Sequence, residues 1–525
     1  MKWSKDTMIR LAEKTYEKPM QRYLCVFCSV VFWYLFAHGY RFANNMFAHD
    51  ALLQIYQDDS AWQIALGRVL QPILLFLRGG LCNPWLISFC AVLWLSFSVY
   101  LVVDLLEIRK LISINMISGV MACNTVLTAL NASFLPWVDF FMLSLFLAVA
   151  GVWLCKKGTG RFLCLGAITL AVAMGIYQAY ISVSIVLVIF LLLREVQESS
   201  ELKYFIKKTI YYCIALLAAA LLYYLMWQVI RRLFGIWVAD SYNGLAALGD
   251  YTEKSLLSTI GLAYQKVFYY LTHSDTFVTM TFRGRSLSIV WKYLLCGVNI
   301  IVIAGLIFMM VQKNLKKGRK IWQYLFQALL LLVLPAAINF VCIISKGNDH
   351  ILTLYALVLL YVFVIRLVEE KSRVWIKAVV WMSVLCMIWT NVVYANQVYL
   401  KRELQDRAVT SFMARIVVDM EEVEGYEPGV TPVAFCGPFG SSPYLQEMEG
   451  LEELLPYGMT KTPLTYTGTE EAFIRYELAV PINYTRISWE DPEVVRMPTY
   501  PYEGSIAYVG EVLVVKISNI EAQDH

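Results

Sequence analysis

The sequence predicts an all-α polytopic membrane protein with about eleven transmembrane helices, followed by a small soluble α/β domain. Of the 525 residues, 59% are hydrophobic and only 16% are charged, whereas soluble domains average about 25% charged residues. The mean hydropathy of +0.58 excludes soluble enzymes, disordered chains and fibrous proteins. The third observation is a change in the sign of the net charge near residue 396.

This change of charge separates a basic membrane part, residues 22–396, from an acidic soluble part, residues 397–525. The soluble part holds 21 Asp and Glu against 9 Lys and Arg, a net charge of −12, and residues 1–396 have a net charge of +16. A basic membrane part is typical of cytoplasmic anchoring. No basic face with interleaved aromatic residues occurs outside the membrane boundaries, so a nucleic-acid partner is not expected.

The membrane part is divided into spans by its hydropathy, because a helix needs about 20 apolar residues to cross the hydrocarbon core. Segments of this kind cover residues 22–40, 81–106, 111–130, 135–155, 161–177, 178–195, 208–234, 288–312, 321–344, 350–368 and 374–396. Clusters of Lys and Arg fall at every second junction, and the positive-inside rule assigns those junctions to the cytoplasm. We therefore expect residues 1–21 to be cytoplasmic and residues 397–525 to be extracytoplasmic.

Two long outside loops, 41–80 and 235–287, mix apolar and polar residues at helical spacing. One apolar stripe, at residues 66–77, stands beside Arg68, and a second lies at residues 256–271. Amphipathic helices of this kind lie along a membrane surface. They either only cover the bundle or also shape a site beneath them, and the sequence is compatible with both.

The soluble part begins with a polar helix at about 401–424. Thr431–Phe435 and Ser505–Ser518 then have the pattern of strands, the second with a turn near Gly510-Glu511. Pro and Gly punctuate the rest. No catalytic motif stands out in this domain.

Acidic residues at the outer boundary are the candidates for catalysis. Asp50 comes shortly after the first span, and partial desolvation under an amphipathic lid raises the basicity of a carboxylate toward that of a general base. The alternative is a solvated loop acid. Asp139 lies just inside the fourth span, where an ionisable group is a functional candidate by default. Its alternative is a buried carboxylate bonded to neighbouring backbone.

Cations are rare in the outside loops, and those present suggest an anionic ligand. Arg283 and Arg285 stand before the eighth span, and Lys346 and His350 lie in the short turn before the tenth. Arg suits phosphate because its planar fork donates two N–H groups at once. Lipid head groups explain the same residues, and a lone His is more often a structural contact than a catalyst.

Cofactor motifs are absent from the sequence. It has no GxxxxGK[ST] loop and no GxGxxG after a strand, and its five scattered His do not form a zinc site. The energy for any reaction must then come from the substrate itself or from an ion gradient.

The first outside loop and the middle of the chain contain a set of short motifs: Asn44 to Asp50, Asp58-Asp59, Gly67-Arg68, Gln71-Pro72, Asn83-Pro84-Trp85 and the mid-chain Gly175-Ile176-Tyr177-Gln178-Ala179-Tyr180. In these motifs the chain resembles the bacterial glucosyltransferases of the serotype-converting type, which belong to the C-type (GT-C) membrane glycosyltransferases. The resemblance covers about residues 20–400.

This resemblance implies an inverting enzyme that transfers a hexose, usually glucose, from a polyprenyl-phosphate donor in the membrane to a cell-surface or lipid-linked glycan. An acid of the first outside loop acts as general base, and the position falls best on Asp50, with Asp58 and Asp59 as the second choice. No cofactor is required, although clustered acids are compatible with a divalent cation. The expected substrate-binding residues are His49, Arg68, Asp139, Tyr177, Gln178, Tyr180, Arg283, Arg285, Lys346 and His350.

Three other functions compete with this interpretation. A transporter or lipid-sugar flippase is expected to show an internal repeat and central charges, and this sequence has no repeat. A polysaccharide polymerase or ligase places its main features in a late outside loop, whereas here the first loop is richest in them. A structural or receptor protein gives no reason for Asp50 and Asp139.

Overall fold

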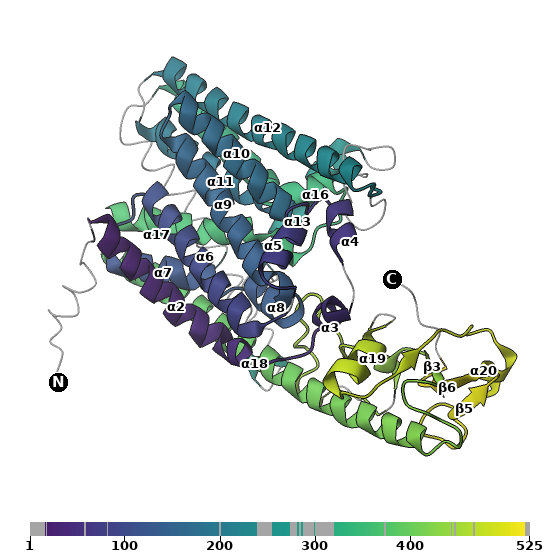
Figure 1. Ribbon diagram of the computed structural model, residues 1–525. Coiled ribbons are helices and arrows are strands. Elements are labelled where there is room, and N and C mark those ends of the chain that lie inside the picture. The colour runs from purple at the N-terminus through teal and green to yellow at the C-terminus, as the bar shows by residue number, and fades with distance from the viewer. Residues whose placement is uncertain are drawn as a thin grey trace, which may run out of the picture.

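The computed structural model describes a helical bundle and, at one end of it, a smaller domain that contains a sheet (Figure 1). We call this smaller part, the described residues between 422 and 519, the tail domain. The end of the bundle that adjoins it is the tail side of the bundle. The described residues are 16, 18–56, 59–80, 82–198, 201–238, 255–272, 281–282, 285–286, 299, 320–371, 374–442, 444–445, 448–465 and 468–519. Outside them lie residues 1–15, nearly all of the predicted span 288–312, much of loop 235–287, Asp58 and Arg283.

The described elements of the bundle and its loops are helices and one two-stranded antiparallel sheet. They are α2 (Pro19–Ala43), α3 (His49–Tyr56), α4 (Ser60–Ala65), α5 (Gln71–Leu77), α6 (Pro84–Leu105), α7 (Leu111–Ala122), α8 (Thr125–Ser133), η1 (Leu135–Trp137), α9 (Val138–Lys156), α10 (Gly160–Tyr177), η2 (Gln178–Tyr180), α11 (Ile181–Glu198), α12 (Leu202–Leu233), α13 (Leu256–Thr272), β1 (Thr281–Phe282), β2 (Arg285–Ser286), α15 (Ile321–Ile338), α16 (Phe340–Ile344), η4 (Ile351–Thr353), η5 (Tyr355–Leu357), α17 (Val358–Lys371) and α18 (Val374–Glu421).

Among the described residues, seven helical stretches are long and apolar enough to cross a membrane, or eight if the bent pair α7–α8 is one span. The chain is therefore a polytopic helical membrane protein, and the predicted count of eleven is not confirmed. One reason is that the stretch Gly160–Glu198 enters this count once, whereas the sequence predicts two spans there. Another is that most of the predicted eighth span lies outside the described residues.

The stretch Gly160–Glu198 contains two helices, as predicted. Tyr177 has an extended backbone, and the single turn η2 separates α10 from α11. Both helices bond to α9: Ser144 Oγ donates to the carbonyl of Ala173, at 2.9 Å, and Ser184 Oγ donates to the carbonyl of Ala148, at 3.0 Å. The break therefore turns the chain back along α9, at a position that also borders the cavity described below.

Two other predicted spans are interrupted by Asn residues. In the segment 111–130 the axis bends by 43° between α7 and α8, where the side chain of Asn124 caps α8 by accepting from the N–H of Leu127. In the segment 321–344 the chain breaks at Asn339, four residues after Pro335, which interrupts the helical bonding. The side chain of Asn124 thus stabilises a new helix start, which hydropathy does not show.

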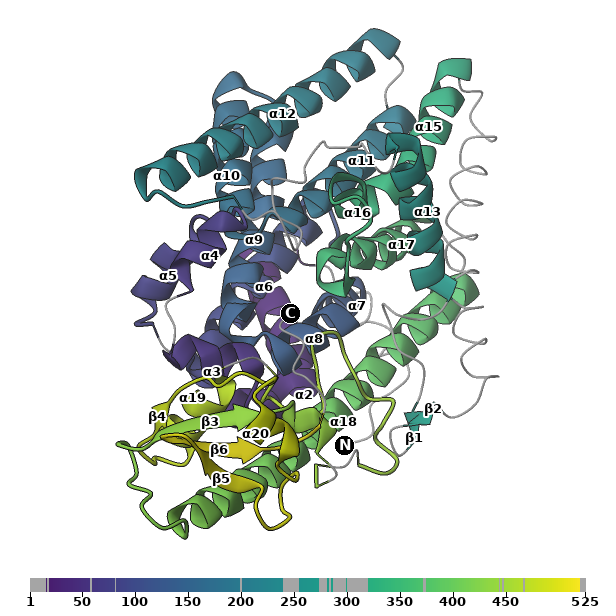
Figure 2. The same cartoon turned by 90° about the vertical axis from the view of Figure 1, so that its right-hand side faces the viewer.

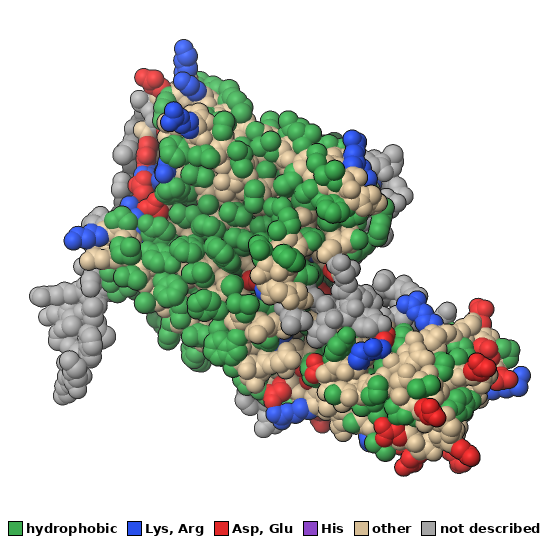
Figure 3. Space-filling view, in the orientation of Figure 1, with side chains coloured by type: hydrophobic (Ala, Val, Ile, Leu, Met, Phe, Trp, Pro, Cys, Tyr) green, Lys and Arg blue, Asp and Glu red, His purple; other side chains and the backbone are tan. Residues whose placement is uncertain are grey.

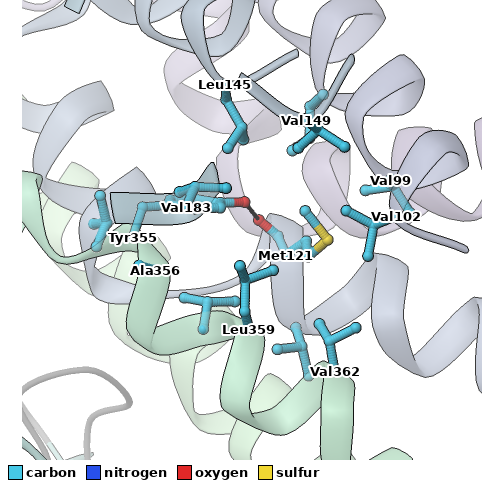
Figure 4. Close-up of a cluster of buried hydrophobic side chains, with 14 of the residues drawn as sticks. Val99, Val102, Met121, Leu145, Val149, Val183, Tyr355, Ala356, Leu359 and Val362 are labelled. Carbon is cyan, nitrogen blue, oxygen red and sulfur yellow. Dashed lines mark hydrogen bonds between the residues drawn. The ribbon is translucent and has the colours of Figure 1, made fainter. Parts of the chain in front are cut away.

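The interior of the bundle is packed with aliphatic side chains from helices that are far apart in the sequence. Figure 4 shows Val99 and Val102 of α6 beside Met121 of α7 and Leu359 of α17. The hydroxyl of Tyr355 donates to the carbonyl of Met121 at 2.7 Å, so its buried polar atom is bonded. This core holds the first, middle and late helices in one unit.

A close helix contact lies where α9 and α10 meet at two glycines. A Cβ on Gly166 would lie 2.8 Å from the carbonyl oxygen of Gly151 and nearer still to Sγ of Cys155. We expect Gly166→Ala to lower the free energy of unfolding by about 1–3 kcal/mol, because overpacking forces the helices apart. Thermal unfolding in detergent measures this. Gly261→Ala in α13, where a Cβ meets nothing within 4 Å, is the control, and an equal loss in both variants would contradict the prediction.

Helix α18 connects the bundle to the tail domain without a break. Its 48 residues extend about 70 Å at 1.5 Å per residue, more than twice the thickness of a hydrocarbon core of about 30 Å. The sequence predicts a span at 374–396 and a separate helix at 401–424, and the structure joins the two. In Figure 2 the helix runs from the bundle along the underside of the tail sheet.

The tail sheet has four strands in the order β4-β3-β6-β5. Strand β3 is parallel to both β4 and β6, and β5 and β6 form an antiparallel hairpin, so the predicted strands and the turn near Gly510 are confirmed. The tail elements after α18 are β3 (Pro432–Cys436), η6 (Phe439–Ser441), α19 (Thr469–Ala472), η7 (Phe473–Glu477), β4 (Asn483–Tyr484), α20 (Pro492–Arg496), β5 (Ile506–Val509) and β6 (Val512–Lys516).

The two parts differ in surface chemistry. On the face that Figure 3 shows, the bundle is covered mainly by hydrophobic side chains, and the tail domain carries scattered acidic and basic ones. An apolar belt around a bundle is the surface that a bilayer requires. The tail domain is suited to water.

Candidate active site

A cavity of about 250 Å³ lies between α10, α11, α12 and α16. Most of its wall is apolar, and its polar residues come from the turn before α5, the α10–α11 break, α12 and the segment 345–353. Leu217, in the wall on α12, is 70% exposed, so the wall reaches the outer surface of the bundle. The lining residues are Leu66, Arg68, Met174, Tyr177, Gln178, Ala179, Ile181, Ile185, Leu216, Leu217, Ala220, Tyr223, Phe340, Val341, Ile344, Ser345, His350 and Thr353.

The structure brings four of the predicted substrate-binding residues to this cavity. Arg68, Tyr177, Gln178 and His350 all line it, although they come from three distant segments. The guanidinium of Arg68 lies 5.5 Å from the centre of the Tyr177 ring, a distance at which a ring face attracts a cation.

Arg68 is oriented by a relay that includes one of the predicted acids. Its Nη1 donates to Oε1 of Gln63 at 3.1 Å, and Nε2 of Gln63 donates to the carboxylate of Asp59. The negative charge of Asp59 is thus linked to Arg68 through an amide. Gln63 was not predicted, since a Gln in a surface helix has no distinguishing signal in the sequence.

The turn that carries Arg68 is held by side chains from two spans. Gln178 Nε2 donates to the carbonyl of Leu66 at 2.6 Å, Tyr223 Oη donates to that of Gly67 at 3.1 Å, and Trp227 Nε1 donates to that of Ile64 at 3.0 Å. Gly67 has a φ of 89°, which favours glycine. Tyr223 and Trp227 were not predicted, because in the sequence they look like ordinary aromatic residues of an apolar span.

Three buried polar atoms of residues that line the cavity have no hydrogen-bond partner within the described chain: Oε1 of Gln178, Oγ of Ser345 and Nδ1 of His350. Leaving such atoms unpaired costs free energy, so a ligand whose hydroxyl groups donate to the amide oxygen, or whose phosphate oxygens accept from the imidazole, stabilises this arrangement. Burial, together with the nearby charge of Arg68, lowers the pKa of His350 to about 4. His350 is therefore neutral near pH 7 and supplies a hydrogen bond rather than a positive charge.

The turn that presents His350 is fixed from both sides. Asp349 accepts from Nδ2 of Asn339 at 2.8 Å and from the ammonium of Lys266. On the other side the ring of Tyr457, from the tail domain, stacks on the His350 ring with the centroids 4.6 Å apart. The tail domain thus takes part in shaping the cavity mouth.

Other predicted substrate-binding residues lie away from the cavity wall. Asp139 is 5% exposed and pairs with Arg78 at 2.6 Å, a partner that the sequence analysis did not propose. Tyr180 is buried behind Tyr177, the ring centroids 5.1 Å apart, and Lys346 follows the lining residue Ser345. Arg285 lies in β2, and Arg283 and Asp58 lie outside the described residues.

Asp50 occupies the first turn of α3 and does not line the cavity. Its carboxylate lies 3.1 Å from Nε2 of His49, and its side chain is 27% exposed. Four rings in succession connect this position to the cavity. Their centroids are 6.0 Å apart from His49 to Phe134, 6.0 Å from Phe134 to Tyr457 and 4.6 Å from Tyr457 to His350.

Fold and cavity together define a polytopic membrane protein with a mostly apolar cavity that holds a few polar side chains. The model of the family described as "Glucosyl transferase GtrII" matches residues 39–365, more than half of the chain. The chain belongs to this glucosyltransferase family, which confirms the resemblance seen in the first loop. The matched region includes Asp50, Arg68 and His350 and ends before α18 and the tail domain. No curated protein and no solved structure matches this chain significantly.

Proposed function

We propose that this membrane glucosyltransferase transfers glucose from a polyprenyl-phosphate donor to a cell-surface or lipid-linked glycan, with inversion, at the outer face of the cell membrane. The amino terminus is then cytoplasmic and the tail domain extracytoplasmic. The observation that carries the proposal is the cavity, which combines an apolar wall that reaches the outer surface of the bundle with a cation and three unpaired buried polar atoms. A polyprenyl phosphate has the matching chemistry, an apolar tail and an anionic head.

In this reaction the acceptor hydroxyl loses its proton to the carboxylate of Asp50 as its oxygen attacks the anomeric carbon. The bond from that carbon to the phosphate oxygen breaks, and polyprenyl phosphate leaves with the electron pair. Arg68 stabilises the charge that develops on the phosphate, and His350 donates or accepts a hydrogen bond. Arg283, Arg285 and Lys346 stay candidates for further contacts with the phosphate.

The hydrogen bonds of Asp59 favour Asp50, rather than Asp59, as the base. Asp59 accepts a hydrogen bond from Gln63, which binds Arg68, so its carboxylate already serves the orientation of the cavity cation. Asp50 is partly exposed and pairs with His49, so its carboxylate is within reach of an acceptor from water. Asp58 stays the other alternative among the first-loop acids.

The purified chain in liposomes, supplied with polyprenyl-phosphate glucose labelled in the sugar and with cell-envelope glycan, tests the proposal. We expect covalent label in the glycan and release of polyprenyl phosphate. Label that only crosses the bilayer while still attached to its lipid would contradict the proposal and identify a flippase. Formation of long glycan chains from lipid-linked units would identify a polymerase.

Metal dependence is tested separately. Among the described residues no group of three His, Cys, Asp or Glu side chains is arranged to hold a metal ion. We propose that Arg68 provides the positive charge that a metal supplies in other transferases. Transfer should keep about its full rate in excess EDTA, and a loss that is restored by Mg²⁺ or Mn²⁺ but not by Ca²⁺ would contradict this.

A further inference from the structure

We propose that Asp406, on α18, is a positioning residue that fixes the segment carrying Asp50, and this inference rests on the proposed role of Asp50 as the base. The segment runs from the end of α2 to the start of α3. Asp406 lies outside the region matched by the family model, which ends at residue 365. The position of the base is then set by a part of the chain beyond that region.

The first half of this segment is held by a buried cation of α2. Arg41, with 0% exposure, donates to the carbonyl oxygens of Asn131 at 3.0 Å, Asn44 at 2.7 Å and Met46 at 3.1 Å. The guanidinium group of Arg41 thus links the segment to α8 through hydrogen bonds. Hydrogen bonds from a buried charged donor are about twice as strong as neutral ones.

The next residue is held by α18. The carboxylate of Asp406 accepts the backbone N–H of Phe47 at 2.7 Å, and this Asp is 7% exposed. Nε of Arg402 lies 3.7 Å from its other oxygen, which is an ion pair but too long for a hydrogen bond. Asp406 therefore directs its short hydrogen bond at the backbone N–H of Phe47, three residues before Asp50.

The residues on both sides of Asp50 pack into the tail domain. The ring of Phe47 meets Phe473 edge to face at 5.3 Å, and Leu52, 1% exposed, belongs to the same hydrophobic core as Phe412 and Phe473. Figures 1 and 2 both place α3 beside α19. Asp50 thus lies between two residues, Phe47 and Leu52, that are both held by contacts with α18 and the tail domain.

Two different parts of the chain therefore set the two halves of the proposed site. The residues that line the cavity come from the bundle, whereas the position of Asp50 depends on Asp406 of α18. A displacement of about 1 Å of a catalytic group can lower a rate about 100-fold. Loss of the Asp406 bond should therefore reduce kcat and leave the KM for the donor nearly unchanged.

The test compares Asp406→Leu, which removes the acceptor at similar volume, with Asp406→Asn, which keeps an oxygen for the Phe47 N–H. We expect Asp406→Leu to lower kcat at least about 10-fold, the equivalent of 1.4 kcal/mol, with the donor KM within about threefold. Asp406→Asn should stay within about threefold of the unmodified chain in both constants. Glu421→Leu, at an exposed acid of the same helix, is the control and should change neither.

Hydrogen exchange of peptides that cover residues 44–52 gives a readout independent of turnover. It should become at least about tenfold faster in Asp406→Leu, while peptides at residues 63–70 and 174–181 keep their protection. Unchanged exchange at 44–52, or an Asn variant as inactive as the Leu variant, would overturn the proposal. If the unmodified chain transfers no glucose, the proposed function fails, and the exchange result still decides whether Asp406 holds the segment.

Discussion

Asp50→Asn should lower kcat for glucose transfer by about 10²–10⁴-fold, the usual contribution of a general base. The amide has nearly the same shape as the carboxylate but cannot accept the proton of the acceptor hydroxyl. The donor KM should change little, because Asp50 does not line the cavity. The measurement is the steady-state rate with purified polyprenyl-phosphate glucose at saturating acceptor.

Asp59→Asn is the matched control for this prediction. It lies in the same loop, but its bond to Gln63 places it in the relay to Arg68. We expect it to raise the donor KM more than it lowers kcat. Full activity of the Asp50 variant, or a larger loss of kcat in the Asp59 variant, would remove Asp50 from the mechanism and assign the base to another acid of the loop.

The second large effect is expected for Arg68→Ala, which should lower kcat/KM for the donor by about 10²–10³-fold. Among the described residues that line the cavity, Arg68 is the one that carries a positive charge, and the variant removes it. The loss of one preorganised charge at a developing anion has this magnitude. Arg68→Lys should recover only part of the activity, because an ammonium lacks the fork that binds Gln63 and the plane that lies over Tyr177.

A competition experiment separates contact with the phosphate from general damage to the cavity. Polyprenyl phosphate should inhibit the Arg68→Ala variant much more weakly than the unmodified chain, whereas the free polyprenol should inhibit both equally. Arg231→Ala is the control, because this cation also lies over an aromatic ring, that of Trp227 at 5.4 Å, but does not line the cavity. Equal weakening of phosphate and alcohol would contradict the role of Arg68.

Hydropathy predicted the long spans well because it reflects a direct physical requirement. A backbone in hydrocarbon must satisfy its own hydrogen bonds, so an apolar run of sufficient length forms a helix. Residues 22–40 and 135–155, for example, fall within α2 and within η1 and α9. The break at Asn124 was not predicted, because one polar residue that caps a new helix hardly changes the hydropathy of the segment.

The continuity of α18 is a second feature that hydropathy does not predict. The sequence has a polar stretch after residue 396, which suggested the end of one helix and the start of another. The helix Val374–Glu421 contains neither Gly nor Pro, and nothing else in it breaks the hydrogen bonding. A change in polarity marks where a helix leaves the membrane but not where it ends.

Single site residues could be predicted, but not their meeting in space. Arg68, Tyr177 and His350 were each selected for their chemistry, and only the fold of the bundle brings them to one cavity. Arg41 was missed although it is a charged residue at the end of a span, and the rule that selected Asp139 applies to it equally. Asp406 had no such signal, because an acid in a polar helix is ordinary.

The central claim is that the donor binds with its phosphate at the end of the cavity that adjoins the tail domain, beside Arg68 and His350. A structure of the chain with bound polyprenyl-phosphate glucose tests this most directly. We predict the first isoprenoid units between α12 and α16, and a phosphate oxygen within about 3 Å of the Arg68 guanidinium, the usual distance for such a bond. A phosphate bound elsewhere, with this cavity empty or filled by membrane lipid, would contradict the account.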